Sequence, residues 1–207
     1  MVLGSHVIFG AYGFWLPNDP RGSWSEFVGA WELYRFGRAT KTAETRSLAA
    51  RQHDVPFRLA AKQALKRPAV ELNGMQAGEV AAGFADYARR SRLAIWACAI
   101  LPDHVHLVLG RHRLHVEQLV IQLKSSATRR LLADGLHPFQ QVDRSAKCFA
   151  RGQWKVFLDG PEDVRRAIAY VERNPLKEGL PPQRWGFVAP YCERAPLRSP
   201  SLASRRG

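Results

Sequence analysis

Cysteine is scarce in this chain of 207 residues, and its three cysteines stand far apart. Cys98, Cys148 and Cys192 form no C-x-x-C pair, which excludes a disulfide framework and a zinc knuckle and fits a reducing compartment. Long apolar runs are missing as well. Because no stretch of about 18 uncharged apolar residues occurs, we expect no membrane-spanning segment.

Acidic residues are the second shortage. The chain has 18 Asp and Glu against 31 Lys and Arg, which gives a net charge of +13 and a pI near 10.4. Most of the cations are arginines, 24 against 7 lysines. Arginine binds phosphate oxygens through two parallel hydrogen bonds and stacks on bases. The codon usage of a GC-rich genome explains part of the arginine count but not the net charge, so the balance predicts a nucleic-acid partner.

The length and the hydrophobic content of 46% suit one domain with its own core. We expect that domain over residues 1–193, followed by a basic flexible tail over residues 194–207, where Pro, Ser and Arg become frequent. Residues 14–70 form an aromatic-rich insertion without a sustained period. It is expected to be a satellite cluster packed on the sheet; the alternative is a surface on which bases stack.

Hydrophobic periodicity predicts the remaining elements. Within the insertion we expect two short helices separated at Pro56 and a short strand over residues 69–72. The order of elements predicts an α+β fold with a ferredoxin- or RRM-like βαββαβ core, an antiparallel sheet, an extra C-terminal helix and a long N-terminal insertion. The expected strands cover residues 2–12, 93–101, 104–109 and 154–158, and the expected helices cover residues 76–92, 116–133 and 161–174, the last ended by Asn174-Pro175.

Two histidines lie two positions apart in the predicted strand of the segment AILPDHVHLVL, residues 99–109. Side chains at i and i+2 of a strand share a face, so His104 and His106 should point the same way. Buried imidazoles need partners for both ring nitrogens, and one metal ion would supply them. The alternative is a pair of hydrogen-bonded structural histidines. The other histidines are left without a role: His6, His53, His112, His115 and His137.

The last predicted helix adds a phenol and an amide. Tyr170 and Asn174 are four residues apart and therefore lie one above the other on the helix. If this stripe faces the histidine strand, the site combines two imidazoles, an amide oxygen and a phenolic nucleophile, the parts needed to cleave a phosphodiester covalently. The alternatives are a boundary aromatic residue for Tyr170 and a helix stop for Asn174-Pro175.

The segments PDHVHLVL (102–109) and AIAYVERNPLKEGL (167–180), with the basic helix between them, resemble the single-tyrosine HUH transposase superfamily. The resemblance is to its branch of REP-associated tyrosine transposases, and it covers residues 93–180 and the first strand. It implies that His104, His106 and Asn174 bind a divalent metal. It also implies that Tyr170 attacks single-stranded DNA, leaving a 5′-phosphotyrosine and a free 3′-OH.

The same resemblance implies the cofactor and the partners. Mg²⁺ or Mn²⁺ would serve, and imidazole ligands favour tighter binding of Mn²⁺. The partner would be single-stranded or hairpin DNA with REP-like repeats, cut by a cytoplasmic, nucleoid-associated bacterial protein that is a monomer rather than a dimer. The basic side chains expected to meet phosphates are Lys124, Arg129, Arg130, Arg165 and Arg166.

Three other functions remain open at this point. A hydrolase of the histidine-triad kind would need a third alternating histidine, but residue 108 is valine. A catalytically inactive, domesticated DNA- or RNA-binding protein would account for the charge alone. A ribonuclease or RNA-binding module is the third, because βαββαβ sheets also bind single-stranded RNA.

Overall fold

Four antiparallel strands form the centre of the molecule. The computed structural model describes residues 1–17, 31–37, 54–143 and 145–193. The strands lie in the order β2-β3-β1-β4, and each neighbouring pair is antiparallel. With the intervening helices this is the predicted α+β arrangement with a βαββαβ core, which is confirmed. The strands are β1 (Gly4–Gly10), β2 (Ile95–Ile100), β3 (His104–Gly110) and β4 (Trp154–Leu158).

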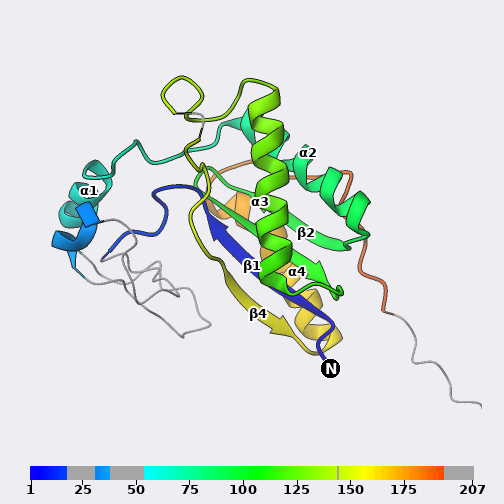
Figure 1. The fold of residues 1–207 in the computed structure, drawn as a ribbon. Helices are drawn as coiled ribbons and strands as arrows, with labels where there is room; N and C mark the ends of the chain where they lie inside the picture. Colours follow the sequence, from blue (N-terminus) through cyan, green and yellow to red (C-terminus); the bar gives the residue numbers. More distant parts are fainter. Residues whose placement is uncertain (18–30, 38–53, 144, 194–207) are drawn as a thin grey trace, which may run out of the picture.

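Helices cover both faces of the sheet. In Figure 1, α2 (Gly74–Ser91) and α3 (Val116–Ala133) lie across the front of the sheet, and α4 (Pro161–Lys177) lies behind it. The two faces follow from the alternation of side chains along each strand. Phe9 and Leu107 point into the core under α2 and α3, whereas Val108 points into a smaller core under α4. The bounds of α3 and β4 agree with those predicted from the sequence.

The crossing of α2 and α3 depends on one glycine. A Cβ atom added at Gly83 would lie 2.6 Å from the Cα of Ala127 on α3. The backbones of the two helices therefore approach each other more closely than any side chain at position 83 would allow. The contact fixes the layer of two helices on the front face.

The helix α4 runs through Pro175 to Lys177, so the predicted end at Asn174-Pro175 is wrong. A Schellman motif ends the helix instead: the Leu180 N–H donates to the Pro175 carbonyl at 2.8 Å, and Gly179 has φ +71°. A proline inside a helix removes one N–H donor and strains one turn. The burial of Asn174 and Pro175 offsets this cost. The extra turn keeps Lys177 on the helix.

The chain after α4 returns to the edge of the sheet at β2. The side-chain amide of Gln183 accepts from the Ile100 N–H at 2.8 Å and donates to the Ile100 carbonyl at 2.7 Å. Further on, the Ala189 N–H donates to the Ile95 carbonyl at 2.9 Å. We call residues 180–190 the C-terminal strap. It follows β2 without forming a strand of its own.

The described part of the insertion has its own small core. The 3₁₀ helix η1 (Trp31–Phe36) and α1 (Val55–Gln63) lie beside the sheet rather than on either face (Figure 1). The core is a separate cluster of Leu16, Leu33, Phe36 and Ala61. These residues form a satellite cluster beside the sheet, whereas Phe14 and Val70, at the two ends of the insertion, pack on the sheet itself. Residues 18–30 and 38–53 of the insertion, and the predicted tail over 194–207, lie outside the described residues.

Two local predictions within the insertion also need correction. Pro56 does not separate two helices; it is the second residue of α1, where its missing N–H has no cost, and Asp54 caps the Phe57 N–H at 2.9 Å. Residues 38–53, which directly precede Asp54, lie outside the described part. Residues 69–72 form no strand, although Val70 N–H donates to the Tyr12 carbonyl and Leu72 N–H to the Pro102 carbonyl. No helix in the described part of the chain is long and apolar enough to cross a membrane.

Candidate active site

Three histidines meet on the face of the sheet that α4 covers. His104 and His106 alternate along β3, and their ring centroids are 4.9 Å apart. His6 on β1 pairs with Val108, so it is diagonal to His106 on the same face. The ring centroids of His6 and His106 are 5.5 Å apart. His6 and His106 are 100 residues apart in the sequence, and the pairing of β1 with β3 brings them together.

His6 and His106 share a hydrogen bond. The Nε2 of His6 lies 3.2 Å from the Nδ1 of His106, and both residues are buried. Burial lowers the pKa of His6 to about 4. Burial also holds the pKa of His106 well below its usual value, assisted by the charges of His104, His6 and Lys177. Both imidazoles are therefore neutral at pH 7, and a neutral imidazole can offer a nitrogen lone pair to a ligand.

His104 is held from both sides. Its Nδ1 lies 2.6 Å from the carboxylate of Asp103, the residue just before it. A carboxylate only accepts, so it fixes the proton on Nδ1 and leaves Nε2 as the free nitrogen. The ring of Phe14 stacks on His104 with the centroids 4.7 Å apart. The first residue of the insertion therefore supports the site.

The helix α4 presents Tyr170 to the histidines. The ring centroid of Tyr170 lies 5.6 Å from that of His6 and 5.8 Å from that of His106. Its side chain is 37% exposed, so a large substrate can reach it although it borders buried rings. The stripe of α4 that carries Tyr170 faces the histidine strand, the arrangement on which the sequence argument depends.

Asn174 lies one turn after Tyr170 and is almost completely buried. Its Nδ2 has no hydrogen-bond partner among the residues that the structure describes. A buried amide without a partner costs about 1 to 3 kcal/mol. The two ends of an amide have the same shape, so a half-turn of the group brings its oxygen to the same place. A ligand at this position would therefore satisfy the amide with either atom.

Lys177 completes the surroundings of Tyr170. Its Nζ lies 4.3 Å from the centroid of the Tyr170 ring, two helical turns away along α4. The sequence argument missed Lys177 because it ended the helix before this residue. In the structure its ammonium group lies over the face of the Tyr170 ring.

The donor set fits a divalent ion of the Mn²⁺ or Mg²⁺ kind. No three His, Cys, Asp or Glu side chains of the described chain converge as ligands, so a site here needs a ligand of another type. The buried amide of Asn174 is a ligand of that type, and it would be added to the two imidazoles of His104 and His106. Nitrogen and amide oxygen donors together suit Mn²⁺ better than Mg²⁺, which prefers oxygen alone.

The basic residues singled out in the sequence divide between the two sides of the sheet. Lys124 is turned inward: its Nζ donates to the carbonyls of Ala150 and Gly152 at 2.9 and 2.6 Å, and burial lowers its pKa to about 8. The other four form local contacts. Arg129 donates to Ser125, Arg130 pairs with Glu79, Arg165 pairs with Glu162 and Glu193, and Arg166 pairs with Asp163.

Of these five basic residues, only Arg165 and Arg166 share a helix with Tyr170. Lys124, Arg129 and Arg130 belong to α3, on the opposite face of the sheet (Figure 1). The structure therefore does not gather the five residues into one surface. A DNA strand that reaches Tyr170 would meet the arginines of α4 first.

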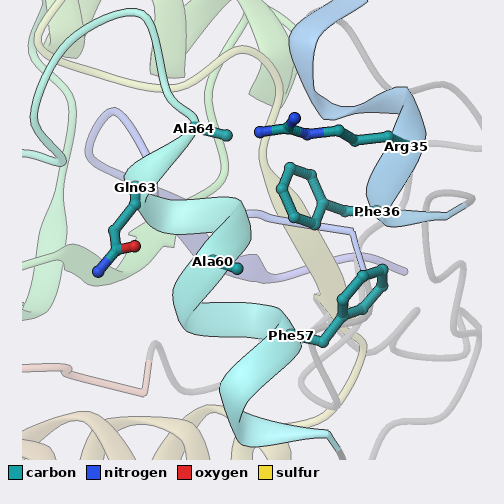
Figure 2. A pocket seen from close by; sticks show the side chains of 6 residues that line it. All are labelled: Arg35, Phe36, Phe57, Ala60, Gln63 and Ala64. Atoms are coloured by element: carbon teal, nitrogen blue, oxygen red, sulfur yellow. The ribbon is translucent and has the colours of Figure 1, made fainter.

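One cavity of the described part lies away from this site. It has a volume of about 490 Å³ and lies between η1 and α1, outside the histidine site. Figure 2 shows the ring of Phe36 directed toward α1 at Ala60 and Ala64, with Arg35 above it. Because the residues around it carry no nucleophile, the cavity offers no chemistry comparable to that of the histidine cluster.

No protein-family model matches the chain, and no curated protein matches it. Two solved structures are similar to it in fold. One is a REP-associated tyrosine transposase bound to a REP hairpin, with 13% sequence identity and a TM-score of 0.46, covering 86% of this chain and 70% of that one. The other, from Deinococcus radiodurans R1, is a protein proposed to be a transposase, with 16% identity and a TM-score of 0.42, covering 84% and 91%. The chemistry is therefore argued from the site itself.

Besides Lys177, His6 is a site residue that was not predicted from the sequence. It is one histidine in an apolar strand, and nothing near it in the sequence carries chemistry. The available signal was its position: in a strand over residues 4–10, a polar side chain at residue 6 shares a face with Ile8 and Gly10. That signal needs the pairing of β1 with β3 before it points to His106.

Proposed function

We propose that this protein is a metal-dependent endonuclease and strand transferase for single-stranded DNA, acting through Tyr170. The observation that carries the proposal is the accessible phenol of Tyr170 beside the ring of His106, which in turn lies beside His104, with the buried partnerless amide of Asn174 one turn further along the same helix. The substrate would be hairpin DNA with REP-like repeats.

In the proposed reaction the Tyr170 oxygen attacks the phosphorus of the scissile phosphodiester. A bond forms between the phenolic oxygen and phosphorus, and the bond between phosphorus and the 3′ oxygen breaks. The phenol loses its proton to solvent and the released 3′ oxygen takes one up, leaving a 5′-phosphotyrosine and a free 3′-OH. A second 3′-OH can displace the tyrosine by the reverse step, so strands are joined without ATP.

The side chains divide the remaining work. His104, His106 and Asn174 would hold the ion, and a bound Mg²⁺ or Mn²⁺ would stabilise the charge that builds on the phosphate oxygens. Asp103 and Phe14 keep the ring of His104 in place. Lys177 places a positive charge beside the phenol, and the arginines of α4 bind the adjacent phosphates.

The test is the formation of a covalent adduct. Wild type, Tyr170→Phe and the matched control Tyr191→Phe are incubated with 3′-labelled hairpin DNA and Mn²⁺ and run on a denaturing protein gel, because the fragment that stays on the tyrosine is the one that carries the 3′ end. Tyr191 packs on Trp96, away from the histidines. We expect a labelled protein band for wild type and Tyr191→Phe, and none for Tyr170→Phe or with EDTA. Tight DNA binding without any adduct would favour the inactive DNA- or RNA-binding protein instead.

A further inference from the structure

We propose that His6 is a positioning residue: its Nε2 accepts the Nδ1–H of His106 and so keeps the Nε2 of His106 free to bind the divalent ion. This inference rests on the proposed function, because it assigns a role toward the ion held by that site. The contact that carries it is the 3.2 Å separation of the two nitrogens.

The ring of His6 has little freedom to move away. It lies between the edges of two aromatic rings, with centroids 5.5 Å from Trp154 and 5.6 Å from Tyr170. It stacks on His106 with the planes tilted by only 21°. Backbone pairing of β1 with both β3 and β4 fixes the strand that carries it. The hydrogen bond to His106 is therefore built into the centre of the sheet.

A single proton lies in this hydrogen bond, and its position decides what His106 can do. If His6 donated, His106 would carry its own proton on Nε2 and that nitrogen could not ligate. If His106 donates, its Nε2 keeps a lone pair. Ion binding by His106 therefore requires His6 to accept.

The neighbouring ligand follows the same rule by other means. The Asp103 carboxylate can only accept, so it sets His104 in the arrangement with Nε2 free. His6 does for His106 what Asp103 does for His104. The difference is that an imidazole can also donate, so the arrangement at His106 depends on the site around it.

The first test needs no substitution. In the metal-free wild-type protein labelled with ¹⁵N, the ring nitrogens of His106 report by chemical shift which of them is protonated. We expect the Nδ1–H form. A signal for Nε2–H on His106 would overturn the proposal, because a protonated Nε2 has no lone pair with which to bind the ion.

The second test measures Mn²⁺ binding directly, by calorimetry or by the paramagnetic resonance of free Mn²⁺. His6→Gln keeps an acceptor at the place of Nε2, whereas His6→Leu has about the same volume and no acceptor. Because orienting partners typically change metal affinity 10- to 100-fold, we expect a loss of about that size for His6→Leu and near-wild-type binding for His6→Gln. Thermal melting checks that each variant folds.

His106→Ala separates the two levels of the argument. If it abolishes Mn²⁺ binding while His6→Leu binds like wild type, the role of His6 is refuted and the proposed metal site stands. If His106→Ala binds Mn²⁺ like wild type, the metal site in the proposed function is itself wrong, and the role of His6 falls with it. Loss of binding in His106→Ala and His6→Leu, restored in His6→Gln, supports both.

Discussion

The ring of Tyr170 borders two neutral imidazoles on one side and the ammonium group of Lys177 on another. In the proposed reaction negative charge builds on the phosphate as the phenol attacks, so the cation would stabilise the transition state more than the bound substrate. Lys177 is exposed, so its effect is screened by solvent. We expect Lys177→Ala to slow adduct formation by about tenfold and Lys177→Arg to retain most of the rate.

The measurement is the rate of adduct formation under single-turnover conditions, with DNA in excess of its binding constant. Glu178→Ala, next in the chain and also exposed, serves as the control. An unchanged rate in Lys177→Ala would show that the ammonium group takes no part in the reaction.

Lys124 gives the clearest dependence of stability on pH. Burial lowers its pKa in the folded protein to about 8, against 10.5 in the unfolded chain. Between these values the unfolded chain keeps a proton that the folded protein has lost, so the stability contributed at this site rises with pH across that window. Relative to Lys124→Met, wild type should gain up to about 3 kcal/mol from pH 8 to pH 10.5.

Urea unfolding of wild type and Lys124→Met at several pH values measures this difference. Taking the difference removes the titration of groups common to both proteins. A difference that does not change with pH would mean that the folded protein leaves this ammonium group well solvated.

Residues were predictable where a local rule places them. Spacing alone put His104 with His106 and Tyr170 with Asn174; in the structure the rings of His104, His106 and Tyr170 are neighbours, and Asn174 is buried one turn after Tyr170 on α4. His6 was not predictable from the sequence, because its role depends on the order of strands rather than on spacing. The chemical roles of these residues stay predictions until the adduct and the ion are measured.

At the level of elements, the contact of α2 with α3 depends on a position without a side chain. A methyl group at Gly83 would lie 2.6 Å from the Ala127 backbone, so the helices must move apart. Gly78, on the same helix, has open space where its Cβ would be. We expect Gly83→Ala to destabilise the protein by about 1 to 3 kcal/mol. Gly78→Ala should stabilise it by about 0.5 to 1 kcal/mol.

Thermal or urea unfolding of the two variants measures both effects against wild type. The pair is matched, since the same methyl group is added to the same helix. Equal stabilisation by both substitutions would mean that α2 and α3 are farther apart at Gly83 than the structure shows.

The end of α4 shows why element boundaries escaped the sequence argument. Asn174-Pro175 is an ordinary stop signal, yet the helix continues because both residues are buried and Gly179 forms the cap. Local propensity was overridden by tertiary packing. The α3 and β4 boundaries, where periodicity and turn residues agree, were predicted correctly.

For the whole molecule, the basic residues of α3 and those of α4 lie on opposite faces of the sheet, and Tyr170 lies on the face of α4. Because phosphate contacts release counterions, each lost contact on single-stranded DNA should reduce the slope of log affinity against log salt by about 0.7. We expect Arg166→Gln on α4 to weaken binding and reduce the slope by about this amount. Arg129→Gln on α3 should leave both unchanged.

Fluorescence anisotropy with labelled hairpin DNA at several salt concentrations measures the two slopes. Both substitutions are made in the Tyr170→Phe background so that no cleavage interferes. The two arginines are both exposed and differ in the face of the sheet on which they lie. Equal effects would mean that DNA wraps around both faces.

The architecture was more predictable than its attachments. The βαββαβ order follows from period-2 and period-3.6 patterns, and these reflect burial on the two faces of one sheet. The insertion has no such pattern, because its small core of Leu16, Leu33, Phe36 and Ala61 is built from residues scattered along the chain. Its position beside the sheet could not be read from the sequence.

The C-terminal strap has a consequence for self-association. An outermost strand with free N–H and C=O groups is a template to which another chain can add, and such edges promote aggregation. Gln183 and Ala189 occupy the backbone groups of Ile100 and Ile95 that β2 would otherwise present to solvent. The strap thus protects the edge of the sheet at β2. A chain cut after Gly179 would leave these backbone groups free to pair with another chain, and we expect it to aggregate.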